Sequence, residues 1–547
     1  MCVIKKILLS PNFINHVSIA KSFLMNKKLF KEKYVVAICI ALVSAFSAWL
    51  NYSWNDLDYL QWKSLDEYTF HGVLVKLHHA LVTLDIRSFF AYSFYSYGFI
   101  FFLINYFAVF PFFSDPTSEF MIFIPKMVNT VFFILSLLYM NLSMKELKIN
   151  NFYRFLAFVF IIAMPGIWFN VNWFHPDFMM TAFLLMAIYF LSKSHFTLNK
   201  YNDTAIVFWG IAIAIKIQAI TFAPIFIWLI CKRISYHGVS SSELRLLAKI
   251  ALLIVSIYVL LNPYLLHLDG INAWVENLKA EFFNASYREG NPLLPLSIKL
   301  NFGIFNYYMT PLLFISVLSC SLFLTVKDIN SRRFSIMGAL SLTILANMVY
   351  FIFFMNKGWN HYFLPSIFLS IIIIFSFLES INFNQSSKVI FLSILFIAQL
   401  YSFSLDFEKI FANRFLGVVE SKDSVFDYQP KEYSNEELIE KSNSMFSFLE
   451  KNISTNSFIL SSAYIGLPLK KLNLSYGQVR VIFGSISPSD INWLSSAPQK
   501  ENFILIKKEQ KEKLLNNLSK KLYYPGLEIK IIDENDCCIL LNAKTIN

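Results

Sequence analysis

The sequence predicts an α-helical polytopic membrane protein of about 11 spans, followed by a small α/β soluble domain. Hydrophobic residues make up 56% of the 547 and charged residues only 15%, whereas a soluble domain is usually about half apolar and about a quarter charged. The net charge of +11 comes from basic residues at the N-terminus and in short linkers, which is the positive-inside pattern. They form no single basic patch of the kind that binds nucleic acid, so no nucleic-acid partner is expected.

Nine apolar runs are candidates to cross the hydrocarbon core, which needs about 20 residues in a helix. They occupy residues 34–50, 121–142, 155–172, 177–193, 247–266, 301–325, 335–355, 361–379 and 388–404. Two further apolar stretches, 89–113 and 203–230, are ambiguous in length and composition.

The charge of the linkers assigns their sides. Four linkers are basic and are expected in the cytoplasm with the N-terminus; they carry Lys145, Lys148, Arg154, Lys193, Lys200, Lys232, Arg233, Arg245, Lys249, Lys327, Arg332 and Arg333. The linkers 51–88 and 267–300 are acidic or balanced and are expected outside. For both assignments to hold, 89–113 must lie along the outer interface or re-enter it, and 203–230 must be a hairpin of two half-helices.

Three regions follow from this topology. Residues 1–33 are a basic cytoplasmic N-terminus, and 34–405 are a transmembrane domain with outside loops 51–120 and 267–300. Residues 406–547 are an extracytoplasmic α/β domain, because their pattern changes to short strands and charged amphipathic helices. The expected strands lie at 457–461, 478–484, 502–507 and 537–542, and the expected helices at 435–451 and 508–521.

The first outside loop contains the acidic pair Asp66 and Glu67. Adjacent carboxylates at a membrane surface suit general-base chemistry, because one can raise the proton affinity of the other. An ordinary solvated acidic loop is the alternative for this dipeptide taken alone.

A second polar turn, from Asn172 to Asp177, separates two strongly apolar spans and holds His175 next to Pro176. Ionisable residues at such a position are costly and suggest function. Alternatively, Asp177 only caps the helix that follows it.

A third turn, Asn356 to Pro365, brings Lys357, His361 and Tyr362 to the outer face, where they could neutralise a lipid phosphate or stack on a sugar. A snorkelling lysine in an aromatic belt is the alternative. Lys216 lies between apolar residues in 203–230 and needs an anionic partner or a phosphate. Arg288, in the second outside loop, is another candidate phosphate contact, or a solvated arginine.

Three histidines of the first loop, His71, His78 and His79, raise the question of a metal. His71 and His78 would share a helix face, but carboxylate partners at suitable spacing are missing. No cofactor and no metal site is therefore expected, although a divalent metal is compatible with the composition.

The order and sidedness of these motifs resemble the GT-C membrane glycosyltransferases. The most similar branch is family 39, the protein O-mannosyltransferases and lipid A aminoarabinose transferases. An Asp-Glu pair, a His-Pro-Asp turn and a basic-aromatic turn before Leu364 and Pro365 occur in the same order over residues 34–405. The Pro-Pro-Leu signature common before the second span is replaced here by Tyr95-Ser96-Tyr97-Gly98, which leaves the acceptor open.

The resemblance implies an inverting transferase of the bacterial plasma membrane. It would take a sugar from a polyprenyl-phosphate donor on the non-cytoplasmic face and pass it to a lipid, glycan or protein acceptor. Asp66 would be the base, with Glu67 assisting, and His175 and Asp177 would lie near the acceptor or the base. Lys357, His361 and Tyr362 fall where relatives meet the carrier phosphate, with lysine and histidine in place of the usual arginine.

Three other classes of protein stay open from the sequence. A transporter or flippase would carry charged residues at mid-depth along several spans, whereas only Lys216 is deep here. A glycan polymerase or ligase would place its functional residues in one large late outside loop, such as 267–300. A receptor would bind its ligand through the C-terminal region.

Overall fold

A computed structural model of the chain describes residues 32–52, 55–58, 60, 64–92, 95, 97–195, 199–238, 241–279, 296–354, 360–381, 384–411, 415–418, 430–433, 435–462, 465–475, 478–482, 493–494, 501–508 and 527–545. Most of the basic N-terminus, Arg288, Lys357 and most of the helix expected at 508–521 lie outside these residues.

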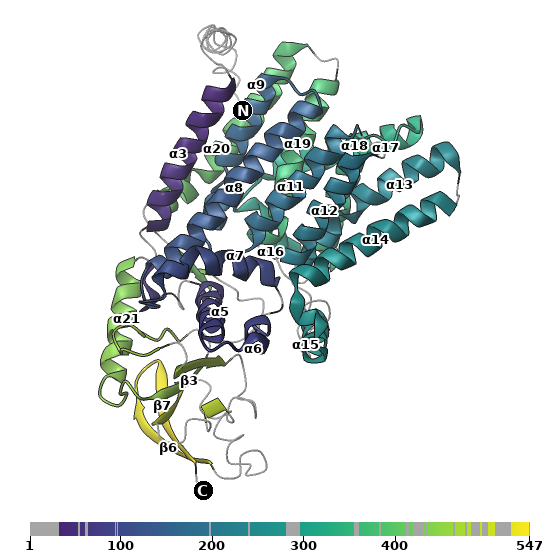
Figure 1. The fold of residues 1–547 in the computed structure, drawn as a ribbon. Helices are drawn as coiled ribbons and strands as arrows, with labels where there is room; N and C mark the ends of the chain where they lie inside the picture. The colour runs from purple at the N-terminus through teal and green to yellow at the C-terminus, as the bar shows by residue number, and fades with distance from the viewer. Residues whose placement is uncertain are drawn as a thin grey trace.

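Most of the described chain is a bundle of long apolar helices (Figure 1). The bundle contains α3 (Glu32–Tyr52), α8 (Phe120–Glu146), α9 (Asn151–Ile162), α10 (Pro165–Val171), α11 (Asp177–Lys193), α12 (Lys200–Ile215), α13 (Ala223–His237), α14 (Ser241–Leu261), α17 (Pro311–Ser331), α18 (Ile336–Val349), α19 (Leu364–Ser380) and α20 (Gln385–Phe411). Within the described residues, six helical segments are long and apolar enough to cross a membrane, or seven if α9 and α10, bent by 67°, count as one span. The predicted polytopic membrane architecture is confirmed.

The two ambiguous stretches do not form single straight helices. Residues 89–113 contribute the end of α6 (Ile86–Phe90), then α7 (Phe99–Val109) and a 3-10 turn, η1 (Phe110–Phe112). Helix α7 lies across one end of the bundle, as an interfacial segment would (Figure 1). Residues 203–230 are divided between α12 and α13, with the break at Lys216 and the 3-10 turn η2 (Ile217–Phe222).

Two predicted spans are changed at a proline. The span expected at 301–325 begins only at Pro311, because Thr310 caps α17 by accepting from the amide of Leu313 and proline occupies the first turn. The preceding residues form α16 (Leu296–Leu300) and a π-helical turn, η5 (Asn301–Phe305). The span expected at 155–172 is broken before Pro165, where α10 starts.

The segments between the long helices that carry the first candidate residues gather at one end of the bundle, the lower end in Figure 1. This end carries α5 (Leu65–Val82), α6, α7, the 3-10 turn η3 (Pro263–Leu266) and α15 (Leu268–Lys279). Helix α5 starts where Ser64 accepts from the amide of Glu67, and the acidic pair occupies its first turn. A capping serine and negative charge both favour a helix N-terminus, so the Asp-Glu pair is held on a helix, not in an irregular loop.

The C-terminal region forms the expected small α/β domain. Its five-stranded sheet has the order β4-β3-β5-β7-β6, with β3 (Phe458–Ser462) parallel to β4 (Val479–Ile482) and β5 (Asn502–Lys507). Strand β7 (Cys538–Thr545) runs antiparallel to β5 and to β6 (Leu527–Glu534). Helix α21 (Asn435–Leu449) matches the expected helix at 435–451, whereas β6 and the pair β1 (Phe415–Val418) and β2 (Pro430–Tyr433) were not predicted.

This domain packs against the first loop at the lower end of the bundle. Leu57, Leu60 and Tyr68 share one buried apolar cluster with residues of the domain, among them Leu467 and Leu469. The carboxylate of Asp58 accepts a hydrogen bond of 2.7 Å from the amide of Lys470. Burial raises the pKa of Asp58, while the amide of Lys470 opposes this effect.

Candidate active site

The turn between α10 and α11 is built by side-chain amides. Asn129 of α8 donates to the carbonyls of Asn170 (2.7 Å) and Trp173 (2.8 Å). Asn170 itself donates to the hydroxyl of Tyr308 at 2.8 Å. The two bonds from Asn129 satisfy backbone carbonyls where one helix ends and the next begins, and they hold the turn that carries His175 against α8.

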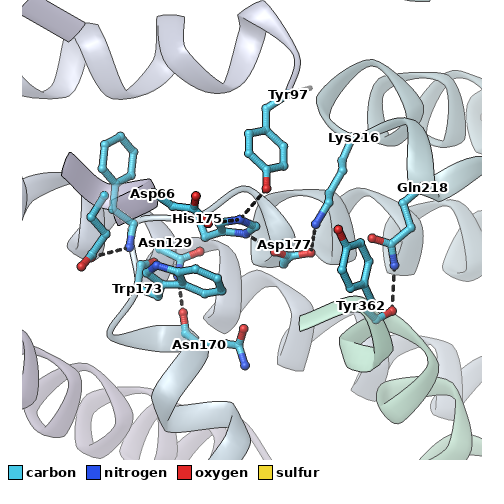
Figure 2. A network of polar contacts seen from close by, with 12 residues as sticks. Asp66, Tyr97, Asn129, Asn170, Trp173, His175, Asp177, Lys216, Gln218 and Tyr362 are labelled. Carbon is cyan, nitrogen blue, oxygen red and sulfur yellow. Dashed lines mark hydrogen bonds and ion pairs between the residues drawn. The ribbon is translucent and has the colours of Figure 1, made fainter. Parts of the chain in front are cut away.

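His175, Asp177 and Lys216, all buried, and the half-buried Tyr97 form a connected group of polar side chains (Figure 2), called here the polar network. The carboxylate of Asp177 contacts Nδ1 of His175 through one oxygen and Nζ of Lys216, at 2.8 Å, through the other. Nε2 of His175 lies 2.9 Å from the hydroxyl of Tyr97. Asp177 is not the cap of α11, which begins after Pro176 without a side-chain cap bond. Its carboxylate joins His175 to Lys216, and His175 extends the network to Tyr97.

Lys216 reaches this network because α12 ends just before it. The residue has extended backbone angles (φ −151°, ψ 119°), so the chain leaves the helix there. The amide of Gly98 donates to the carbonyl of Ile215 at 2.8 Å, and a Cβ at position 98 would lie 1.7 Å from the carbonyl oxygen of Ala214. This close backbone approach requires glycine and sets the end of α12 against the first loop.

The two acidic residues of α5 have different environments. Asp66 keeps 31% of its side-chain surface exposed, and its Oδ2 lies 3.9 Å from Nε2 of His175. Glu67 is fully buried: its Oε1 accepts from the amide of Phe174 at 2.9 Å and lies 3.5 Å from Nζ of the equally buried Lys126. Asp66 is therefore the accessible carboxylate, and Glu67 ties α5 to the turn that carries His175.

The third predicted turn also reaches the polar network. His361 is buried, with its ring 4.8 Å from that of His175 and 5.0 Å from that of Trp173. Tyr362 lies under the Lys216 ammonium, whose Nζ is 4.7 Å from the ring centre. Its carbonyl accepts from Gln218 at 2.7 Å, which connects this turn to η2.

Of the nine predicted site residues, seven belong to the described chain, and six of these meet in space: Asp66, His175, Asp177, Lys216, His361 and Tyr362. Glu67 lies behind them, and the positions of Arg288 and Lys357 fall outside the described residues. Sequence reasoning missed Tyr97, Lys126 and Asn129. Lys126 could have been found from the sequence, because a charged residue inside the expected span 121–142 requires a partner of opposite charge.

The three loop histidines are not gathered around a common point. Nε2 of His71 bonds to the carbonyl of Pro116 at 2.8 Å, whereas the ring of His78 stacks on Phe113. Burial lowers the pKa of His71 to about 4. Among the residues that the structure describes, His175, Asp177 and His361 are the one group of possible ligands, with an atom from each within 4.8 Å of the others.

Structural comparison decides the fold. The chain superposes on the crystal structure of ArnT from Cupriavidus metallidurans bound to undecaprenyl phosphate with a TM-score of 0.50 and 11% identity, over 94% of this chain and 98% of that one. The fold is of the GT-C type. Lower scores are found for apo ArnT of the same organism (0.44, 10% identity, 82% and 88% covered) and for the Archaeoglobus fulgidus oligosaccharyltransferase tethered with an acceptor peptide (0.48, 13%, 91% and 73%).

No protein-family model matches the chain, and no curated protein matches its sequence. The structural likeness therefore concerns the GT-C fold alone, and chemistry has to be argued from the side chains.

This arrangement suits proton transfer by Asp66, which lies next to a buried network in which a negative and a positive charge are paired. Asp177 and Lys216 have opposite charges in direct contact, so the network can stay buried without a large net charge. Asp66 lies at its edge with access to solvent. A carboxylate in that position can take a proton from a bound molecule, with the His175 ring beside it.

Proposed function

We propose that the chain is an inverting glycosyltransferase that uses a polyprenyl-phosphate-linked sugar. The acceptor would be a glycolipid, a glycan or a protein on the non-cytoplasmic face of a bacterial plasma membrane. The main support is Asp66, a partly exposed carboxylate 3.9 Å from a buried His175 on a GT-C fold. The presence of undecaprenyl phosphate in the ArnT structure supports the class of donor.

The proposed reaction needs a base and a stabilised leaving group. Asp66 removes the proton from the acceptor hydroxyl or amine, and the acceptor attacks the anomeric carbon. The bond from that carbon to the phosphate oxygen breaks, and the carrier phosphate leaves with the electron pair. Attack opposite the phosphate inverts the anomeric centre, and cationic side chains stabilise the leaving phosphate.

Within this proposal, the residues of the polar network have supporting roles. Asp177 orients the His175 ring through Nδ1, and Lys216 keeps Asp177 in the charged form. His361, Lys357 and Arg288 are proposed as contacts of the carrier phosphate. Tyr362 offers a ring surface at the same turn.

The decisive experiment compares purified wild-type protein with Asp66→Asn in transfer from a polyprenyl-phosphate sugar. Asparagine keeps the shape and removes the proton acceptor, so turnover should fall about 10²- to 10⁴-fold. Donor binding should be nearly unchanged, because the proposal assigns the Asp66 carboxylate to the acceptor and not to the donor. Wild-type turnover in this variant would reject Asp66 as the base and direct attention to Asp177.

A second experiment tests the donor. His361→Ala and Lys357→Ala should each weaken transfer about 10- to 100-fold if they contact the phosphate, since one charge-assisted hydrogen bond contributes roughly 1.5–3 kcal/mol. Transfer from a soluble nucleotide sugar without any lipid carrier would contradict the proposed donor.

A third experiment tests sidedness. Leu84, which is 77% exposed, follows closely on α5, and α5 lies at the lower end of the bundle in Figure 1. In intact cells, an impermeant thiol reagent should modify the Leu84→Cys peptide, as detected by mass spectrometry. Protection in intact cells and modification after lysis would place this end in the cytoplasm and contradict the proposal.

A further inference from the structure

We propose that Lys216 is the resident cation of a latent divalent-metal site formed by His175, Asp177 and His361. The lysine ammonium takes the place that a metal ion would occupy, so the site holds no divalent metal while Lys216 is present. Shortening Lys216 should convert the same residues into a metal site. This inference concerns metal binding and does not depend on the proposed transferase activity.

The three ligand residues are already assembled. His175 and Asp177 come from the turn that starts α11, and His361 comes from η7 (Asn360–Phe363). One ligand atom from each lies within 4.8 Å of the others, and all three side chains are buried. Two imidazoles and a carboxylate, with a fourth position for water, form a ligand set that zinc and the similar ion cobalt accept.

The Lys216 ammonium already contacts the groups that would attract such an ion. Its Nζ lies 2.8 Å from Oδ1 of Asp177, and it stands over the rings of Tyr97 (5.4 Å) and Tyr362 (4.7 Å). A carboxylate and two aromatic faces around a buried ammonium form a site built for one positive charge.

Charge balance explains why the two cations exclude each other. Asp177 and Lys216 together carry no net charge, so a divalent ion added to the intact network would leave two positive charges uncompensated in a buried place. Without Lys216, the Asp177 carboxylate would be buried without its ammonium partner and would favour a cation. The same loss would open the space that the lysine side chain fills.

The experiment measures cobalt binding by the full-length protein, purified in detergent through a tag without histidines. Visible absorption of tetrahedral cobalt should be absent for wild type and should appear for Lys216→Ala at one ion per chain. It should disappear again in Lys216→Ala/His361→Ala. Lys216→Arg is the matched control: it keeps a cation in the network and should bind no cobalt.

Several results would overturn the inference. One is a cobalt spectrum for wild type that is lost in His361→Ala, because the lysine would then not exclude metal. Another is a spectrum for Lys216→Arg equal to that of Lys216→Ala, because charge would then not matter. The third is a monodisperse, cooperatively unfolding Lys216→Ala without cobalt binding. If Lys216→Ala is not recovered folded, Lys216→Gln, which also removes the charge, is held to the same expectation.

Discussion

Glu67→Gln should destabilise the protein strongly, although the substitution is nearly isosteric. Glu67 and Lys126 are both 0% exposed, and their charged atoms lie 3.5 Å apart. Glutamine can still accept from the amide of Phe174, so the change removes the charge and leaves a buried ammonium without its carboxylate. Breaking one side of a buried ion pair costs about 3–5 kcal/mol. Asp66→Asn, at a partly exposed position, should change stability by no more than about 0.5 kcal/mol.

The assay is the fraction of monodisperse protein that survives heating in detergent, measured by size-exclusion chromatography. Glu67→Gln should lose its monodisperse peak at a clearly lower temperature than wild type or Asp66→Asn. Lys126→Met in the Glu67→Gln background should recover most of the loss, because the unpaired charge is gone. A Glu67→Gln variant as heat-resistant as wild type would refute the role assigned to the pair, and so would a double variant no better than the single one.

Three further predictions concern the lower end of the bundle. Between about pH 6.5 and 4 the unfolded chain binds a proton that buried His71, with its pKa of about 4, does not bind. Wild type should therefore lose up to about 3 kcal/mol more stability than His71→Gln as the pH falls through this range, measured as unfolding temperature against pH. Gly98→Ala should lower both heat resistance and transfer in the same chromatographic and turnover assays, because its Cβ would lie 1.7 Å from the carbonyl oxygen of Ala214. Asp58→Ala should cost about 1–3 kcal/mol and speed limited proteolysis of the C-terminal domain, because it leaves the amide of Lys470 without its acceptor.

The sequence was informative about the helices because the membrane imposes a simple length and polarity rule. Helix α11 has the predicted limits of 177–193, and α8 and α20 contain the predicted runs. The rule failed at 301–310, where apolar residues form a π-helical turn before Pro311. Hydropathy alone cannot separate these states, whereas the threonine and proline at 310 and 311 mark a helix start.

The sequence identified residues of the candidate site by the energetic cost of placing charge at a membrane face. It did not predict which of these side chains contact one another. His175, Asp177 and Lys216 were singled out because charge at the membrane face requires compensation. Which groups compensate one another depends on how α11 begins and how α12 ends, and the close approach of Gly98 that fixes the end of α12 has no local sequence signature. The Asp66-Glu67 pair shows the same limit, since two adjacent carboxylates on one helix turn differ only through what packs on each.

The packing of the C-terminal domain on the first loop bears on how this protein can be shortened or fused. Tyr68, the residue directly after Asp66 and Glu67, is buried in the cluster that also contains Leu467 and Leu469. A chain cut after α20 would expose this face of α5 to water. The helix that carries Asp66 would then lose its apolar contacts with the C-terminal domain. Deletion variants that keep the helical bundle alone should therefore be poor substitutes for the full-length protein, while a fusion partner is better attached where it leaves α21 and the sheet in place.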